Sequence, residues 1–332
     1  MDKKQVKPTN KLRQKGVFAL SIGVAVFLLY FVLRKAGVSG IAEFISRTSV
    51  WVVIAGVLVY TAEMFVRAYR WKEILKINRV EVTLMDSFWG YSLGNGLNIF
   101  MPAKLGDLAR SYYLKHKYGS KYIDTIPTTL MDRFYDIVGI YLVLLFDMIF
   151  IISTIKMERW LTILLAVGLA ALIAGFLVLE ILYKNKKLIR LIPTDLLKGL
   201  AESMLLSYGG ALRNPVQFLK LSAISFVVWG LECVTAFVIF YGAGLQVSPM
   251  ILVFGLMVAT LTKAIPITPG GIGVFEGAMV VCFAMFGIVD AELAVGAAVF
   301  HLILNSYGAL VAVYILIKRG IKTNDIVRGQ TD

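Results

Sequence analysis

The sequence predicts an all-α polytopic membrane protein, built as an inverted repeat with re-entrant or discontinuous helices. Three observations predict this fold class. Hydrophobic residues make up 58% of the 332-residue chain and charged residues only 17%, too few to cover a soluble domain of this size. Several apolar runs reach the roughly 20 residues that cross a hydrocarbon core. The pattern Pro-x-x-Leu/Ile-Gly occurs at 102–106 and again at 269–273, and the offset between the two copies also superposes the apolar segments around them.

Hydropathy predicts membrane spans at 16–36, 48–69, 129–154, 160–183, 216–241 and 291–317. The first follows six Lys and Arg residues and has no small-residue cleavage pattern after it, so we expect it to be retained. Two further stretches, 84–101 and 250–289, contain or adjoin Gly and Pro interruptions, which free backbone groups. At membrane depth only protein or water can satisfy those groups. Each stretch therefore forms a re-entrant hairpin or a discontinuous helix, and the sequence leaves both open.

The distribution of positive charge predicts the orientation. Most Lys and Arg lie in the N-tail, in 67–125, in 184–220 and in the C-tail, which places both termini in the cytoplasm of a multi-pass plasma-membrane protein. The formal net charge of +13 indicates contact with anionic headgroups and not with nucleic acid, because these residues cluster between apolar runs.

The whole chain, 1–332, is predicted to form a single integral membrane domain. Repeat one covers about 48–154 and repeat two about 215–321, and the single connecting span at about 160–183 is what inversion requires. The segment 194–212 has helical spacing behind a Thr194 cap, with its charged residues opposite its leucines. It either lies along the cytoplasmic interface or packs beneath the bundle.

Backbone features of the two broken segments predict an anion site. Pro102 and Pro269 suit the first position of a helix, so both following helices would aim their N-termini inward. A helix N-terminus offers free N–H groups and partial positive charge, and Gly270, Gly271 and Gly273 would let a phosphate approach that backbone. The alternative is that these glycines only permit a tight hairpin and close helix packing.

Ionisable residues within apolar segments cost at least about 2.5 kcal/mol each at a helix centre, so they mark sites or paths. Glu63 and Glu232 are separated by nearly the repeat offset and are predicted at similar depths of related spans. Asp132, Arg133 and Asp136 could instead join helices at the cytoplasmic interface, and His301 could serve helix packing. The residues predicted to contact substrate are Asn95, Pro102, Lys104, Gly106, Asp107, Arg110, Asp132, Arg133, Asp136, Lys263, Pro269, Gly270, Gly271, Gly273 and Glu276, and the candidates for proton coupling are Glu63, Glu232 and His301.

These motifs resemble the membrane region of lysylphosphatidylglycerol synthases, which also occurs alone in flippase-like domain or UPF0104 proteins. The resemblance covers nearly the whole chain. It implies a polytopic helical fold with re-entrant helices, motif residues that line a lipid path, and translocation of phospholipids or related lipid-linked molecules. The soluble aminoacyl-transferring domain of full-length synthases is not found in the sequence, so lysine transfer is not expected. The segments that carry the resemblance are Gly94-Asn95-Gly96, Pro102-x-x-x-Gly106-Asp107-x-x-Arg110, Asp132-Arg133-x-x-Asp136 and Pro269-Gly270-Gly271-Ile272-Gly273-x-x-Glu276.

The sequence favours a lipid flippase-like transporter over an enzyme. We expect an anionic phospholipid or an isoprenoid-phosphate lipid as cargo, with Lys104, Arg110, Arg133 or Lys263 against its phosphate. No Gly-x-x-x-x-Gly-Lys-[Ser/Thr] loop for nucleotide-driven pumping is present. Cys233 lies in an apolar run, as does the second cysteine at 282, and neither gives metal-ligand spacing, so no cofactor or metal is expected.

Two alternatives of other classes remain open. The first is an intramembrane enzyme acting on lipid-linked phosphate or sugar, in which Asp132 and Asp136 would serve as an acid/base pair. The sparsity of nucleophile and base constellations argues against it. The second is a membrane scaffold for a separate lipid-synthesising enzyme. The identity of the lipid, the direction of movement and self-association as a homo-oligomer stay open.

Overall fold

The computed structural model describes residues 44, 46–151, 159–185, 189, 194–263 and 268–319, and the regular secondary structure of this part of the chain is helical throughout. The all-α prediction is therefore confirmed. The predicted first span, 16–36, lies outside the described residues.

The order and lengths of the helices repeat. The first unit consists of α3 (Val50–Ile77), α4 (Leu84–Leu97), the 3-10 turn η1 (Pro102–Asp107), α5 (Leu108–Tyr118) and α6 (Tyr122–Ile151). The second consists of α9 (Pro215–Gly242), α10 (Pro249–Thr262), the 3-10 turn η4 (Pro269–Gly271), α11 (Val274–Met285) and α12 (Ala291–Arg319). The α-helices have 28, 14, 11 and 30 residues in the first unit and 28, 14, 12 and 29 in the second. Between the units lie α7 (Arg159–Lys184), α8 (Asp195–Ser207) and the π-helical turn η3 (Tyr208–Leu212).

Local sequence sets several of these boundaries. Thr83 precedes α4, and its hydroxyl accepts a hydrogen bond from the backbone N–H of Asp86 at 3.1 Å. Asn214 precedes α9 and accepts from two N–H groups of the first turn, with Pro215 at the first helical position. Gly119 ends α5 in the left-handed conformation, with φ of 65°.

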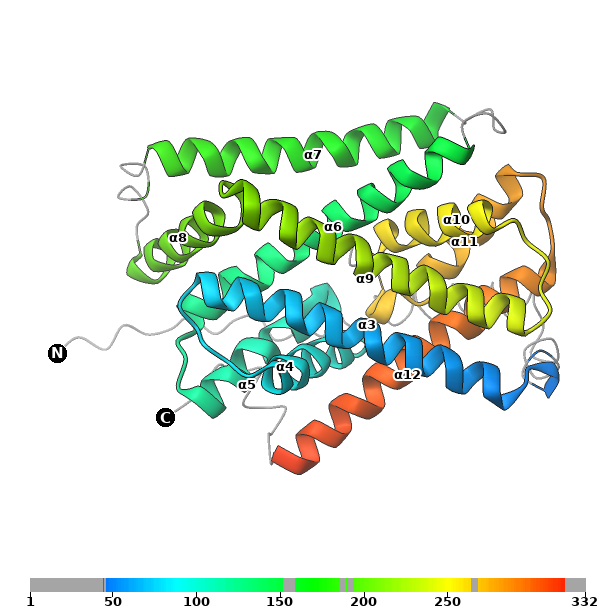
Figure 1. The fold of residues 1–332 in the computed structure, drawn as a ribbon, viewed down its shortest axis with the longest axis horizontal. Coiled ribbons are helices and arrows are strands. Elements are labelled where there is room, and N and C mark those ends of the chain that lie inside the picture. Colours follow the sequence, from blue (N-terminus) through cyan, green and yellow to red (C-terminus); the bar gives the residue numbers. More distant parts are fainter. Residues whose placement is uncertain are drawn as a thin grey trace, which may run out of the picture.

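The two units interlock. α3 packs along α9, and the colours of Figure 1 show that these two helices run in opposite directions. The 14-residue helix of each unit packs against the last long helix of the other unit, α4 against α12 and α10 against α6. The turns η1 and η4 meet between them. Opposed chain directions are what an inverted repeat requires, and the inversion across a membrane stays a prediction.

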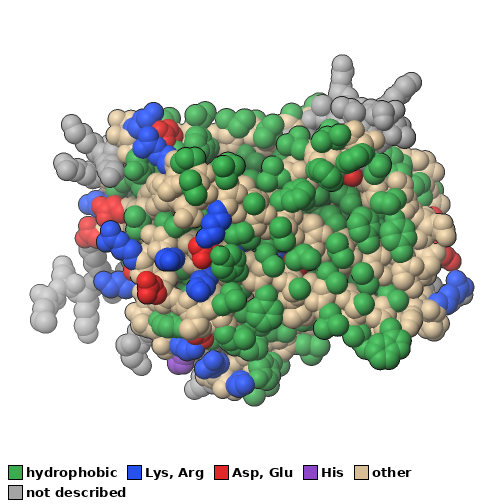
Figure 2. Space-filling view, viewed as in Figure 1, with side chains coloured by type: hydrophobic (Ala, Val, Ile, Leu, Met, Phe, Trp, Pro, Cys, Tyr) green, Lys and Arg blue, Asp and Glu red, His purple; other side chains and the backbone are tan. Residues whose placement is uncertain are grey.

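The surface fits a membrane-embedded protein. By length and composition, four described helices can cross a bilayer: α3, residues Ala166–Lys184 of α7, α9 and α12. The predicted span 129–154 corresponds to α6, which is not among these four. Figure 2 shows hydrophobic side chains over the middle of the molecule, whereas charged side chains gather mainly at the end that carries α8. Several large apolar side chains are exposed, among them Trp51, Val167, Leu177 and Leu310.

The segment 194–212 forms α8 and η3, with Thr194 as the predicted cap. α8 packs against α6. Asn78, at the end of α3, donates to the hydroxyl of Ser203 at 3.0 Å and accepts from the hydroxyl of Ser207 at 2.7 Å. These bonds attach the segment to the bundle, while Leu197 remains half exposed.

The contact between α4 and α12 depends on a glycine. A Cβ atom added at Gly96 would lie 2.1 Å from the carbonyl oxygen of Gly308, well inside van der Waals contact. The Gly94-Asn95-Gly96 motif therefore brings the first broken segment close to the second unit.

We expect Gly96→Ala to lower the free energy of unfolding by about 2 kcal/mol or more, because the backbones of α4 and α12 must separate. Denaturant unfolding in detergent measures this. Gly230→Ala is the matched control, since no atom lies within 4 Å of its added Cβ. The control should be neutral or stabilising by up to about 1 kcal/mol. Equal stability of the two variants would contradict the close-approach argument.

Candidate functional site

A buried network of nine charged side chains joins the two units. Its ion pairs are 2.6–3.3 Å long, and its members come from α3, η1, α5, α6 and α9. Six of them close a ring in which each carboxylate lies between two guanidinium groups: Arg70, Asp132, Arg110, Asp107, Arg133 and Asp136. The other three members are Arg67, Glu63 and Glu232.

The alternation of charge explains how so many ions can be buried. Asp132 accepts from Arg70 Nε and from Arg110 Nη1, each at 2.9 Å, and its side chain is fully buried. Arg133 binds Asp107 in bidentate fashion at 2.7 and 2.8 Å. Each charge removed from water thus gains partners of opposite sign, which offsets the desolvation penalty.

Arg67 lies where the two units meet. It donates to Glu63 at 2.6 Å, to Asp136 at 3.1 Å and to Glu232 at 2.8 Å, and its guanidinium lies 4.4 Å from the ring centroid of Trp229. Arg67 and Glu232 are each the eighteenth residue of a 28-residue helix, α3 and α9. Equivalent positions of the repeat therefore form an ion pair with each other.

A second pair of equivalent contacts supports this alignment of the two units, which we call the repeat register. Arg110 is the third residue of α5 and Asp132 is the eleventh of α6, and their side chains lie 2.9 Å apart. The third residue of α11 and the eleventh of α12, Glu276 and His301, lie 2.7 Å apart. Glu63 and Glu232, predicted at similar depths of related spans, differ by one helical turn in the order of the helices, because Glu63 is the fourteenth residue of α3 whereas Glu232 is the eighteenth of α9.

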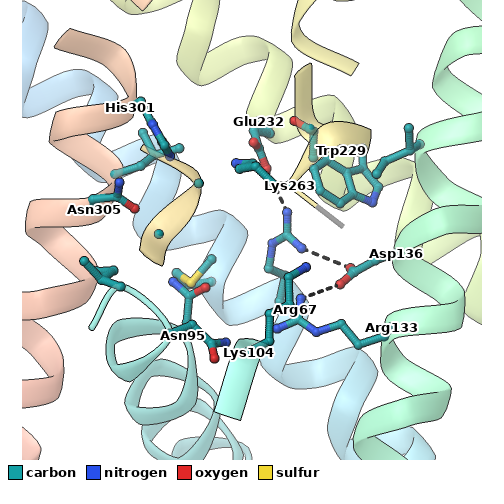
Figure 3. A pocket seen from close by; sticks show the side chains of 18 of the residues that line it. Arg67, Asn95, Lys104, Arg133, Asp136, Trp229, Glu232, Lys263, His301 and Asn305 are labelled. Carbon is teal, nitrogen blue, oxygen red and sulfur yellow. Dashed lines mark hydrogen bonds and ion pairs between the residues drawn. The ribbon is translucent and has the colours of Figure 1, made fainter. Parts of the chain in front are cut away.

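A cavity of about 380 Å³ lies beside this network, where the two broken segments converge. Gly270 N–H donates to the carbonyl oxygen of Asn98 at 3.3 Å, which joins η4 to the end of α4. Figure 3 shows side chains of both units around this space, among them Arg67, Lys104, Asp136, Lys263 and Asn305. Apolar walls are supplied by residues such as Ile99, Ile137, Ile140 and Leu304.

The backbone N–H groups expected to hold a phosphate are already bonded. Gly270 donates to Asn98, Gly271 to the carbonyl oxygen of Thr268 at 3.1 Å, and Gly273 to Glu276 Oε2 at 2.7 Å. Glu276 lies three residues into α11 and caps the terminus of its own helix. Its other oxygen contacts His301 Nδ1, so Glu276 positions the histidine that lines the cavity.

Two lysines are the cations of the cavity that take no part in the ion-pair network. Lys104 and Lys263 line the cavity, and neither forms a hydrogen bond or ion pair with another described residue. Lys263 Nζ lies 4.5 Å from the ring centroid of Phe275. In contrast to the lysines, all four arginines of the network bind carboxylates.

The structure divides the residues predicted from the sequence into two groups. Those lining the cavity are Asn95, Lys104, Arg133, Asp136, Glu232, Lys263, Gly270, Gly271 and His301. Those outside its lining are Glu63, Gly106, Asp107, Arg110, Asp132, Gly273 and Glu276. The side chains of Pro102 and Pro269 lie outside the described set. Gly106 serves packing, because an added Cβ would lie 2.4 Å from the backbone nitrogen of Asn98.

Sequence reasoning missed Arg67 and Arg70. It ended the second span at residue 69 and counted both as cytoplasmic loop charges, whereas α3 continues to Ile77 and both arginines are buried. The spacing of Glu63 and Arg67, four residues apart on one helix face, was the available signal. Other lining residues that were missed are Tyr60, Tyr91, Asn98, Trp229, Thr260, Thr268 and Asn305. Among the described residues, no group of three or more His, Cys, Asp or Glu side chains could hold a metal ion.

The fold and the site define a polytopic helical membrane protein with a charged internal cavity. Residues 18–312 match the family model described as the lysylphosphatidylglycerol synthase TM region, and the chain belongs to that family. No solved structure matches the chain.

Curated relatives agree with this assignment. The chain is 32% identical to a UPF0104 membrane protein of Methanocaldococcus jannaschii over 55% of its own length and 77% of the relative's. It is 22% identical to a UPF0104 membrane protein of Pyrococcus horikoshii over 84% of its length and 90% of the relative's. It is also 21% identical to the glycosyltransferase AglD of Haloferax volcanii, over 76% of its length but only 46% of that protein.

We expect Asp132→Asn to lower the free energy of unfolding by about 3–5 kcal/mol, because it leaves the buried guanidinium groups of Arg70 and Arg110 short of a counter-charge. Asp195→Asn is the control, since that carboxylate is fully exposed and should leave stability unchanged. Chemical unfolding in detergent compares the two. A stable Asp132→Asn variant would show that the ring does not hold the helices together.

Proposed function

We propose that this protein moves an anionic phospholipid or a lipid-linked phosphate between the leaflets of its membrane. The observation that carries the proposal is the cavity between the two broken segments, which presents Lys104 and Lys263 without carboxylate partners. Membership of the family and the match to a glycosyltransferase indicate a function related to membrane lipids. The finer assignment to transport is our inference.

The lining of the cavity suits an amphiphile. Its wall includes ammonium and amide groups as well as Ile, Leu and Met side chains. The ammonium and amide groups can bind a lipid headgroup, and the apolar side chains can contact the first carbons of its acyl chains. The cavity also lies between structurally repeated units, the position at which alternating-access transporters hold their substrates.

The contact between α3 and α9 would serve as the axis of the movement. The pair of equivalent residues, Arg67 and Glu232, lies on this contact and borders the cavity. Rocking of one unit against the other about that contact would leave these partners together while other ring contacts rearrange. Such a movement would expose the cavity to one leaflet and then the other.

The match to a glycosyltransferase favours a second candidate, an intramembrane enzyme acting on lipid-linked sugar or phosphate. His301, oriented by Glu276 and lining the cavity, is the group that would act as its base. Formation of a new lipid product by the purified protein would support this candidate over transport.

Reconstitution in vesicles tests the proposal. Fluorescently labelled phosphatidic acid, phosphatidylglycerol and phosphatidylcholine are placed in both leaflets, and a membrane-impermeant quencher measures exchange. We expect protein-dependent exchange of anionic lipids, and an at least tenfold slower rate for Lys104→Gln or Lys263→Gln, since each removes a charge-assisted contact worth about 1.5–3 kcal/mol.

Lys184→Gln provides the matched control, because that side chain is exposed at the end of α7 and lies away from the cavity. It should exchange lipids at the rate of the unmodified protein. Identical exchange in vesicles with and without protein, for phosphatidic acid, phosphatidylglycerol and phosphatidylcholine alike, would overturn the transport proposal.

A further inference from the structure

We infer that the cavity selects a headgroup that ends in a phosphate monoester or diphosphate over the phosphodiester headgroups of common phospholipids. The inference deepens the proposed function by naming the class of headgroup, and it rests on the same cavity. It does not depend on movement of the lipid. Lys104, Lys263, Thr260 and His301 are the residues that carry it.

Two cations of the cavity lie outside the ion pairs and can contact a ligand, although the network itself has one more carboxylate than arginine. The four arginines of the network are shared among five carboxylates, Glu63, Asp107, Asp132, Asp136 and Glu232. Lys104 and Lys263 lie outside these pairs and come from different units. A terminal phosphate has three free oxygens, so it can contact both ammonium groups and still present one oxygen to a further polar group. A diester has only two free oxygens, and contacts with the two ammonium groups would use both.

The backbone brings Lys104 to this position at a conformational cost, and a glycine makes room for Lys263. Lys104 has φ of 54°, in the left-handed region that residues other than glycine rarely adopt. Gly271 has φ of 73°, and an added Cβ there would lie 2.7 Å from Cγ of Lys263. The stem of Lys263 therefore crosses directly over Gly271. The Gly270-Gly271 pair makes room for this lysine, whereas its N–H groups are bonded elsewhere.

Thr260 gives an independent indication of a ligand. Its side chain is 7% exposed and lines the cavity, and its hydroxyl forms no hydrogen bond. An unpaired buried hydroxyl is unfavourable, so a bound phosphate oxygen would satisfy it. In the repeat register Thr260 corresponds to Asn95, because each is the twelfth residue of its helix, α10 and α4, and Asn95 also lines the cavity. Both units thus present a neutral polar group at the same position.

His301 distinguishes a monoester from a diester. Its Nδ1 contacts Glu276 Oε1 at 2.7 Å, an arrangement in which Nδ1 carries the proton and donates to the carboxylate. Nε2 is then the ring nitrogen available as an acceptor. A phosphate monoester has a second pKa of about 6, so its singly charged form carries a P–OH group that can donate to Nε2. A diester has no such proton.

Binding to the purified full-length protein in detergent tests the inference. The probes are dioleoyl phosphatidic acid, a monoester, and dioleoyl phosphatidylglycerol, a diester with the same chains, with glycerol 3-phosphate as the soluble monoester. We expect phosphatidic acid to bind at least tenfold more tightly than phosphatidylglycerol. Lys104→Gln and Lys263→Gln should each abolish most of this preference, and Thr260→Val should reduce it several-fold. Lys184→Gln should leave it unchanged.

Unfolding temperatures measured without ligand identify any variant that fails to fold. If a lysine variant fails to fold, Thr260→Val provides the test. Equal affinity for the two lipids, or a preference that survives in folded lysine variants, overturns the inference. If glycerol 3-phosphate binds as tightly as phosphatidic acid, the result supports recognition of a phosphate monoester but overturns a lipid as its source. Tight binding of phosphatidic acid without exchange in vesicles overturns the transport proposal but not this inference. Equal exchange of both lipids, slowed to the same extent by the lysine variants, overturns this inference and leaves the transport proposal standing.

Discussion

The ring of alternating charges is the constraint on which the rest of the structure depends. Three arginines and three aspartates from α3, η1, α5 and α6 neutralise one another inside the protein, and Arg67 extends this balance to α9. Because each ion relies on two or more partners, the helices that carry them cannot separate one at a time. The ring thereby fixes part of the wall of the cavity, while Lys104 and Lys263 remain outside its ion pairs.

Fold class was predictable because it depends on composition and on the length of apolar runs, both of which are local properties. The described helices α3, α7, α9 and α12 fall on predicted spans, and the repeated helix order agrees with the proposed repeat. The residue-by-residue alignment of the two repeats was harder to predict from the sequence. Glu63 and Glu232 matched by chemistry, but the packing of α3 on α9 pairs Arg67 with Glu232. Sequence spacing alone could not distinguish alternatives one helical turn apart.

The site was predictable only in part, because its chemistry depends on partners far apart in the chain. Arg67 and Arg70 resemble cytoplasmic anchors until Asp132 and Asp136, which follow much later in the sequence, supply their counter-charges. The glycines were recognised, but their role was not. Glu276 caps the helix that was expected to bind an anion, so the positive end of α11 is already neutralised. Under the proposed function, side chains and not this helix terminus would bind the anion.

The repeat reuses one contact geometry with different chemistry. Arg110 with Asp132, and Glu276 with His301, occupy equivalent positions with the acidic partner exchanged between the helices. The first pair belongs to the closed ring and lies outside the cavity lining, whereas the second contains a histidine that borders the cavity. One unit therefore uses the position to close the ion-pair ring, and the other uses it to orient a side chain that lines the cavity. This asymmetry lets two structurally similar halves take different roles at one cavity.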